Sequence, residues 1–195
     1  MLRINNYNNW SQPLPSDADY AEQLTNLAKH WRICMIEKYI DGIDMTVEEI
    51  KTLQTSGNVY ALYTLCCLPS WDTEDLRQFP VASGTVDTND WYLRDGNGDI
   101  VYESGTATKF IDVGKEGFKE EFTEQLLSRM EGKGFTGVVF DYWWANMISN
   151  HMDVPSATYP DDATWYTNAW QPFIDYAMDA LVESVLKIRG MSSIK

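Results

Sequence analysis

Short apolar segments of strand length alternate with amphipathic helical segments along most of the chain, and this alternation constrains the fold more than any other feature. The strand-like segments are mostly apolar, as is typical of strands buried on both faces of a parallel sheet, and they cover residues 31–37, 59–65, 109–113 and 137–141. Apolar residues recur at helical spacing in four further segments, residues 16–29, 46–55, 118–130 and 170–185. The pattern predicts an α/β fold built from βαβ units around a parallel sheet.

Residues 69–106 interrupt this alternation with an irregular pattern. Within them, residues 95–99 read Asp-Gly-Asn-Gly-Asp and stand between two strand-like runs, 91–94 and 100–103. Gly and Asn readily adopt the left-handed backbone that tight hairpin turns need. The sequence therefore predicts a β-hairpin that departs from the main sheet.

The number of βα units helps to decide whether the sheet closes into a barrel or stays open. A complete eight-unit barrel typically needs roughly 250 residues, whereas this chain offers four suitable strands followed by a helix in 195 residues. No phosphate-binding glycine loop follows any of the strands, which removes the commonest reason to expect a nucleotide-binding open sheet. We therefore expect a single α/β domain over residues 1–195. We expect it to be a partial TIM-type (β/α) barrel of about four βα units with a hairpin insertion near residues 91–103 and an extended N-terminal arm over residues 1–15.

The charge of the chain limits its partners. It carries 29 Asp and Glu residues against 15 Lys and Arg, which gives a formal net charge of −14. The resulting negative potential repels phosphate backbones and polyanionic polymers, and the basic residues form no cluster that would override it. We therefore expect no nucleic acid and no acidic polysaccharide as partner, and favour neutral or cationic ones.

Potential metal ligands are few. The chain has three cysteines and two histidines and no Cys-x-x-Cys pair, so we expect buried free thiols, no metal site and no cofactor. The longest apolar runs are only as long as a strand. The residues after Met1 are polar and lack the basic stretch followed by an apolar one that a signal peptide has. No signal peptide and no membrane span is therefore expected, and the compartment stays unknown.

Three carboxylates stand where a strand-like segment gives way to its loop, namely Glu37, Asp112 and Asp141. The carboxyl ends of the strands converge on the active site in barrel enzymes. Glycoside hydrolysis uses two carboxyl groups beside the scissile bond, one to protonate the leaving oxygen and one to act as nucleophile or to activate water. These three residues are therefore the candidate catalytic acids. The alternative is that they cap loops or pair with basic residues, such as Lys38 beside Glu37.

Aromatic residues are concentrated in the same predicted loops and in the hairpin, and the candidates for substrate binding are Trp71, Trp91, Tyr142, Trp143 and Trp144. The apolar face of a pyranose ring can lie on an indole ring, while indole N–H and tyrosine O–H groups hold sugar hydroxyls. Tyr142, Trp143 and Trp144 are the strongest candidates because they follow the same strand as Asp141. The alternative is that the aromatic rings pack the loops against the scaffold.

Three segments resemble a known family, namely residues 91–98, 110–113 and 134–141, the last of which reads Gly-Phe-Thr-Gly-Val-Val-Phe-Asp. They are similar to segments of glycoside-hydrolase barrels related to endo-α-1,4-polygalactosaminidase. The resemblance implies that Asp141 lies in the active site and that Asp112 is the strand-end acid before it. Thr136 stands where that family commonly has Asp, and residues 142–144 replace a more polar continuation, so the substrate is expected to differ.

Together these features predict a glycoside hydrolase that cleaves a neutral or cationic polysaccharide through paired carboxylates. A non-catalytic carbohydrate-binding or structural protein built on a truncated barrel is one alternative, and a small open α/β domain with an unrelated ligand is another. An incomplete barrel exposes strand edges that invite pairing. We therefore expect either a homodimer or completion by a missing C-terminal half of the barrel.

Overall fold

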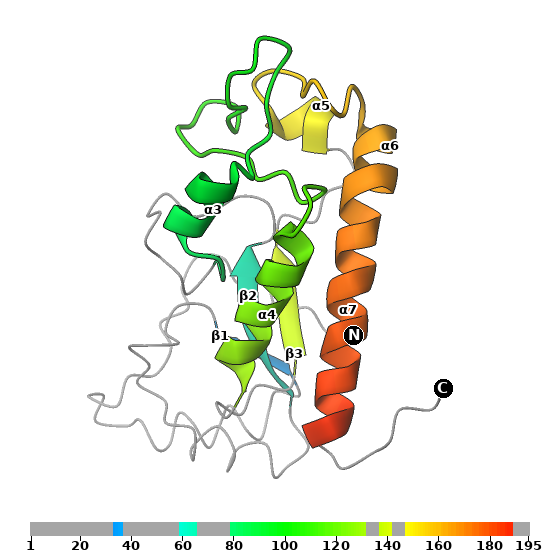
Figure 1. The fold of residues 1–195 in the computed structure, drawn as a ribbon. Coiled ribbons are helices and arrows are strands. Elements are labelled where there is room, and N and C mark those ends of the chain that lie inside the picture. Colours follow the sequence, from blue (N-terminus) through cyan, green and yellow to red (C-terminus); the bar gives the residue numbers. More distant parts are fainter. Residues whose placement is uncertain (1–32, 37–58, 66–78, 132–136, 142–146, 189–195) are drawn as a thin grey trace, which may run out of the picture.

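A three-stranded parallel sheet lies at the centre of the fold. In this computed structural model, residues 33–36, 59–65, 79–131, 137–141 and 147–188 are described. The sheet has the strand order β1-β2-β3 (Figure 1), with β1 at Ile33–Ile36, β2 at Val59–Leu65 and β3 at Gly137–Asp141. These strands confirm three of the predicted strand segments and their parallel pairing.

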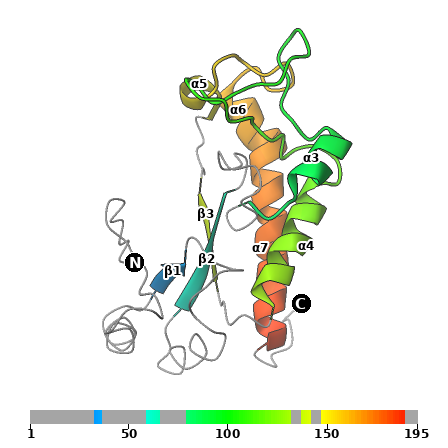
Figure 2. The same cartoon turned by 90° about the vertical axis from the view of Figure 1, so that its left-hand side faces the viewer.

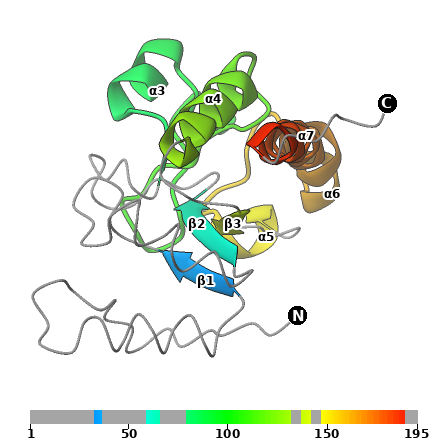
Figure 3. The ribbon, with the colours of Figure 1, turned by 90° about the horizontal axis from the view of Figure 1, so that it is seen from below.

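Two long helices cover one face of this sheet (Figures 2 and 3). They are α4 (Phe118–Met130) and α7 (Gln171–Ile188), and they pack against each other. The amphipathic patterns that predicted helices over 118–130 and 170–185 are thus confirmed. Helix α4 begins after Gly117, whose φ of 80° is readily adopted by glycine. It has two glutamates in its first turn and Arg129 in its last, an arrangement that complements the helix dipole.

A cluster of aromatic side chains forms the core between these helices and the sheet. The ring of Phe122 on α4 lies 5.0 Å from that of Phe173 on α7, edge to face, and 6.5 Å from that of Phe140 on β3. Phe118 lies 5.8 Å from Phe173. Because Phe118, Phe122 and Phe173 are each fully buried, they remove a large apolar area from water and hold the helices against the strands.

The predicted strand at 109–113 is wrong as a member of the parallel sheet. Tyr92 and Ile111 form an antiparallel bridge, and so do Tyr102 and Lys109. A run of five mostly apolar residues shows that a segment is buried, but it does not specify which strand the segment pairs with. The preceding hairpin supplies an antiparallel partner only a few residues away, so the segment pairs with the hairpin and the parallel sheet has three described strands.

The predicted hairpin is confirmed. Arg94 and Ile100 form its antiparallel bridge, and the backbone N–H of Asp95 donates to the carbonyl of Asp99 across the turn at 2.9 Å. Gly98 has a φ of 88°, a left-handed conformation that favours glycine. The carboxylate of Asp95 accepts the backbone N–H groups of Asn97 and Asp99 and so closes the turn from within.

The hairpin and residues 109–112 form one closed unit. The N–H of Val101 donates to the carbonyl of Leu93, the N–H of Leu93 to that of Phe110, and the N–H of Phe110 to that of Val101, all within 2.9–3.0 Å. Each of the three segments therefore bonds to both others. All three residues are fully buried, so the unit has an apolar centre of its own.

The loops beyond the carboxyl ends of β2 and β3 contain further short helices (Figures 1 and 2). They are α3 (Ser83–Asn89), α5 (Met147–His151), α6 (Asp162–Trp165) and the π-helical turn η1 (Tyr166–Trp170), which leads directly into α7. The sequence pattern did not predict α3 or α5, which have seven and five residues and are too short for a clear helical period.

The predicted helices over residues 16–29 and 46–55 and the N-terminal arm over residues 1–15 lie outside the described residues. None of the helices in the described part of the chain is both long and apolar enough to cross a membrane.

Candidate functional site

Asp141 is the last residue of β3 and stands level with the end of the neighbouring strand. The strand register pairs its Cα with that of Leu65, the last residue of β2. The backbone of Asp141 therefore lies at the edge of the sheet where the carboxyl ends of parallel strands meet, as the sequence predicted. The side chain of Asp141 lies outside what the structure describes.

Asp112 lies in the turn that connects the hairpin unit to α4. Its backbone N–H donates to the carbonyl of Trp91 at 2.9 Å, which completes the antiparallel pairing of this segment. Its carboxylate oxygen Oδ1 accepts the backbone N–H of Gly114 at 3.0 Å and the hydroxyl of Tyr159 at 2.9 Å. The residue is only 3% exposed. The carboxylate is thus buried and held from two sides.

Tyr159 comes from the loop between α5 and α6. The hydroxyl oxygen of Ser156 accepts the backbone N–H of Thr158 at 3.2 Å and faces that of Tyr159 at 3.4 Å, which shapes the backbone just before the ring. The ring packs edge to face on Trp165, with their centroids 5.2 Å apart. Because Tyr159 and Asp112 are 47 residues apart, no local spacing in the sequence indicates that they meet.

Gly114 allows Tyr159 to reach Asp112. A Cβ atom at this position would lie 2.3 Å from the hydroxyl oxygen of Tyr159 and 3.0 Å from Cβ of Ala169. The first distance is far below a van der Waals contact, so any side chain at this position displaces the tyrosine hydroxyl or the turn itself. Glycine here is therefore a steric requirement of the Asp112 and Tyr159 pair.

Burial dominates the electrostatics of Asp112. It raises the pKa of the carboxyl above its ordinary value, because desolvation penalises the charged form. The hydrogen bonds from Tyr159 and Gly114 and the positive charge of Lys115 oppose this rise. Burial and the nearby carboxylate also raise the pKa of Tyr159. The tyrosine therefore keeps its proton and acts as the donor in the pair.

Trp91 was a predicted sugar-binding residue, and the structure places its side chain in the core. The ring packs edge to face on Phe118 at 5.5 Å, and its Nε1–H donates to the carbonyl of Glu116 at 3.1 Å. The residue is 6% exposed. Its indole N–H therefore holds the turn before α4, and almost none of the ring is accessible to a ligand.

The other predicted site residues lie outside the described part of the chain, namely Glu37, Trp71, Tyr142, Trp143 and Trp144. Their sequence positions place Glu37 directly after β1 and residues 142–144 directly after β3. Of the predicted residues, the structure describes the side chains of Asp112 and Trp91, and it links them through the backbone bond between Asp112 and the Trp91 carbonyl.

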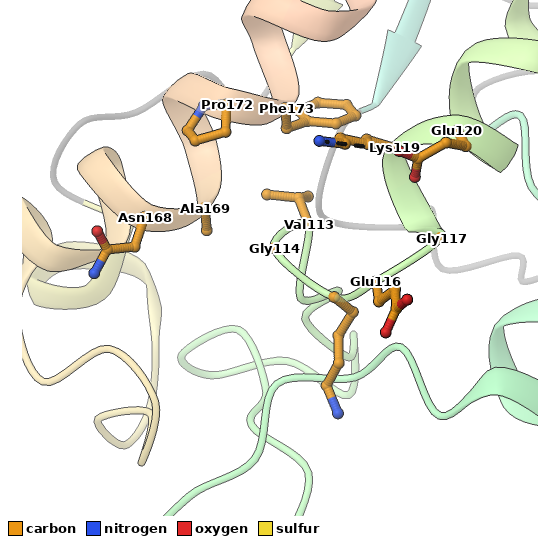
Figure 4. Close-up of a pocket in the computed structure, with 11 residues that line it drawn as sticks. Val113, Gly114, Glu116, Gly117, Lys119, Glu120, Asn168, Ala169, Pro172 and Phe173 are labelled. Carbon is orange, nitrogen blue, oxygen red and sulfur yellow. Dashed lines mark ion pairs between the residues drawn. The ribbon is translucent and has the colours of Figure 1, made fainter.

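A cavity of about 260 Å³ lies between the turn that follows Asp112 and the start of α7 (Figure 4). Its rim carries charges of both signs, including an ion pair of 3.9 Å between Lys119 and Glu120. The lining residues are Val113, Gly114, Lys115, Glu116, Gly117, Lys119, Glu120, Asn168, Ala169, Pro172 and Phe173. Asp112 itself does not line this cavity, but Gly114, whose backbone N–H donates to the Asp112 carboxylate, does. Within the described ranges, no group of three or more His, Cys, Asp or Glu side chains is placed to hold a metal ion.

Comparison with known proteins shows that the fold of this chain is similar to that of solved structures. No protein-family model and no curated protein sequence matches the chain. An α-galactosidase from Thermus thermophilus, solved in complex with p-nitrophenyl α-D-galactopyranoside, superposes with a TM-score of 0.54 at 17% identity over 83% of this chain. A hypothetical protein from Ruminiclostridium thermocellum superposes with a TM-score of 0.50 at 15% identity over 82% of this chain and 86% of its own. This chain spans 32% of the length of the α-galactosidase and shares the fold of that part.

Proposed function

We propose that this protein is glycoside-hydrolase-like, with its site at the carboxyl ends of β2 and β3, and that it cleaves a neutral or cationic polysaccharide. The proposed fold is a partial barrel. The three parallel strands, with helices on one face, support this fold. The fold shared with part of an α-galactosidase also supports it. We also propose that the chain is related to the polygalactosaminidase group. A polymer of amino sugars is cationic and would be attracted by the net charge of −14.

One observation carries the proposal, namely the buried carboxyl of Asp112 in the loop layer beyond the strand ends. Burial raises its pKa and so favours the neutral acid that a glycosidase uses to protonate the leaving oxygen. Because the residue is 3% exposed, this role requires that the loops around it open to the substrate. In the proposed mechanism Asp112 is this acid, and Asp141 is the nucleophile or the base that activates water. Tyr142, Trp143 and Trp144 follow Asp141 in the sequence and would form the stacking surface for sugar rings.

A second candidate function is non-catalytic carbohydrate binding. The observation that favours it is that both hydrogen bonds to the Asp112 carboxylate come from the protein, which a purely structural acid would also show. In this case residues 142–144 would bind sugar, and neither carboxylate would turn it over.

A panel of glycosides separates the two candidates. The full chain is incubated with p-nitrophenyl α-D-galactopyranoside, other neutral p-nitrophenyl glycosides and a galactosamine polymer, and release of product and binding heat are measured. Under the first candidate, Asp141→Asn and Asp112→Asn each lower kcat/KM by about 10²-fold or more, as loss of acid or base catalysis does. Asp179→Asn, which changes an exposed carboxylate on α7, is the matched control and retains activity.

The outcomes differ between the candidates. Full activity of Asp141→Asn on a confirmed substrate contradicts the first. Binding that survives Asp141→Asn but is lost in Trp143→Ala, without any turnover, supports the second.

A further inference from the structure

Both hydrogen bonds that the described residues make to the Asp112 carboxyl go to the same oxygen. Oδ1 accepts the Gly114 backbone N–H at 3.0 Å and the Tyr159 hydroxyl at 2.9 Å. Within the described part of the chain, no donor reaches Oδ2. The two oxygens are therefore unequal, although the carboxyl group itself is symmetric when it is ionised.

This inequality matters when the carboxyl is neutral. A protonated carboxyl has one oxygen that carries the O–H and one that is a carbonyl acceptor. An oxygen that already accepts two donors is poorly placed to carry a proton of its own, so the proton belongs on Oδ2.

We propose that Tyr159 is a positioning residue for Asp112, which fixes Oδ1 as the acceptor and directs the proton of the neutral acid to Oδ2. The part of this inference that concerns catalysis rests on the proposed function. The part that concerns the hydrogen bond and the site of the proton is independent of it.

Packing holds the tyrosine in place independently of the hydrogen bond. Its ring lies edge to face on the fully buried Trp165, and Tyr159 itself is 5% exposed. Its hydroxyl lies over Gly114, where even a Cβ atom would come within 2.3 Å. Removing only the hydroxyl should therefore leave the ring where it is, which makes Tyr159→Phe a clean test.

Few charged groups act on this carboxyl from the described elements. Tyr159 faces it from the loop between α5 and α6, and Lys115 acts from its own turn. The 91–94 segment contributes the carbonyl of Trp91, which accepts the Asp112 N–H. The Tyr159 bond stabilises the ionised form and so opposes the effect of burial on the pKa. Loss of the hydroxyl must then raise the pKa of Asp112 further.

The test is a titration of the Asp112 carboxyl carbon by NMR in the full chain, with Asp112→Asn to assign the signal. Tyr159→Phe is expected to move the titration midpoint to higher pH. A singly fluorinated tyrosine incorporated at position 159 is a more acidic donor and is expected to move it to lower pH. This second change keeps the hydroxyl, so it also tests the proposal if Tyr159→Phe fails to fold.

Tyr92→Phe is the matched control, because the Tyr92 hydroxyl donates to a different carboxylate, Asp87, at 2.6 Å. It removes a bond of the same kind and is expected to leave the Asp112 midpoint unchanged. A midpoint that is the same in the wild type and in Tyr159→Phe overturns the proposal. So does a shift of equal size in Tyr92→Phe.

Activity then separates this inference from the proposed function. If Asp112 is the proton donor, activity falls as pH rises through its pKa, and Tyr159→Phe moves that fall to higher pH. If the NMR midpoint shifts while the alkaline fall of kcat/KM stays in place, Tyr159 does position Asp112. In that case Asp112 is not the acid, and only the catalytic assignment fails.

Discussion

The hydroxyl of Tyr159 lies 2.9 Å from Oδ1 of Asp112 and joins two loops that are 47 residues apart in the sequence. One loop leads from the hairpin into α4, and the other leads from α5 into α6. Both belong to the layer beyond the carboxyl ends of β2 and β3 (Figure 1). Because the bond is buried, it is shielded from competing water and contributes to holding the two loops together.

Gly114→Ala is expected to destabilise the protein by about 1–3 kcal/mol, as overpacking of a filled site typically does. The new methyl group would lie 2.3 Å from the Tyr159 hydroxyl oxygen and would push it away from Asp112. Chemical denaturation monitored by tryptophan fluorescence measures the change in the free energy of unfolding.

Gly84→Ala is the matched control, since no atom lies within 4 Å of a Cβ there. It lies within α3 and should be neutral or stabilising by up to about 1 kcal/mol. Equal stabilities of Gly114→Ala and the wild type would contradict the close approach.

Asp112→Asn is expected to change how stability depends on pH. Burial raises the pKa of Asp112 above the ordinary value of 3.8, so folding favours the protonated carboxyl. The stability that this preference contributes is fully present below pH 3.8 and is lost as pH rises through the pKa of the folded state. Asn cannot ionise and resembles the neutral acid, with an amide N–H₂ in place of the Oδ2 hydroxyl.

Thermal melts of both proteins between acidic and neutral pH check this prediction. The stability of the wild type relative to Asp112→Asn should decrease with rising pH and then level off. A relative stability that increases with pH would mean that the carboxyl is stabilised as an anion, and the sign of its pKa shift would be wrong.

Phe122→Ala is expected to cost about 3–5 kcal/mol of stability, the usual range for emptying a buried aromatic site. The ring is fully buried and contacts aromatic rings from α4, α7 and β3, so its loss leaves a cavity between the helices and the sheet. Val182→Ala on α7, where the valine is 52% exposed, should change stability by less than about 0.5 kcal/mol. Similar midpoints of urea denaturation for the two variants would show that Phe122 is not central to the core.

We propose that the described sheet self-associates through a strand edge. Strands β1 and β3 are its two edges, and each pairs with β2 on one side within the part of the chain described. An exposed strand edge favours pairing with another strand. Light scattering coupled to size-exclusion chromatography should therefore give twice the 22.4 kDa of one chain, with a fraction that rises with concentration. A mass of one chain over the whole range would argue against the homodimer.

Periodicity predicted the elements that repeat a clear pattern over enough residues. The strand at 59–65 and the helix at 118–130 were predicted with the bounds that the structure gives them. For segment 109–113, the apolar character correctly predicted that the segment is buried, but it did not predict which strand the segment pairs with. Its pairing with residues 92 and 102 arises from the neighbouring hairpin.

The sequence by itself determined the three parallel strands, the two long helices α4 and α7, and the hairpin that precedes α4. These features follow from local chemistry, namely side-chain period and turn-forming residues. Only the tertiary structure decided that Trp91 packs in the core instead of facing a loop surface. It also decided that Tyr159 and Gly114 complete the surroundings of Asp112. The physical reason is that a hydrogen bond across 47 residues and a close approach of 2.3 Å depend on how distant segments pack, and no spacing along the chain encodes that packing.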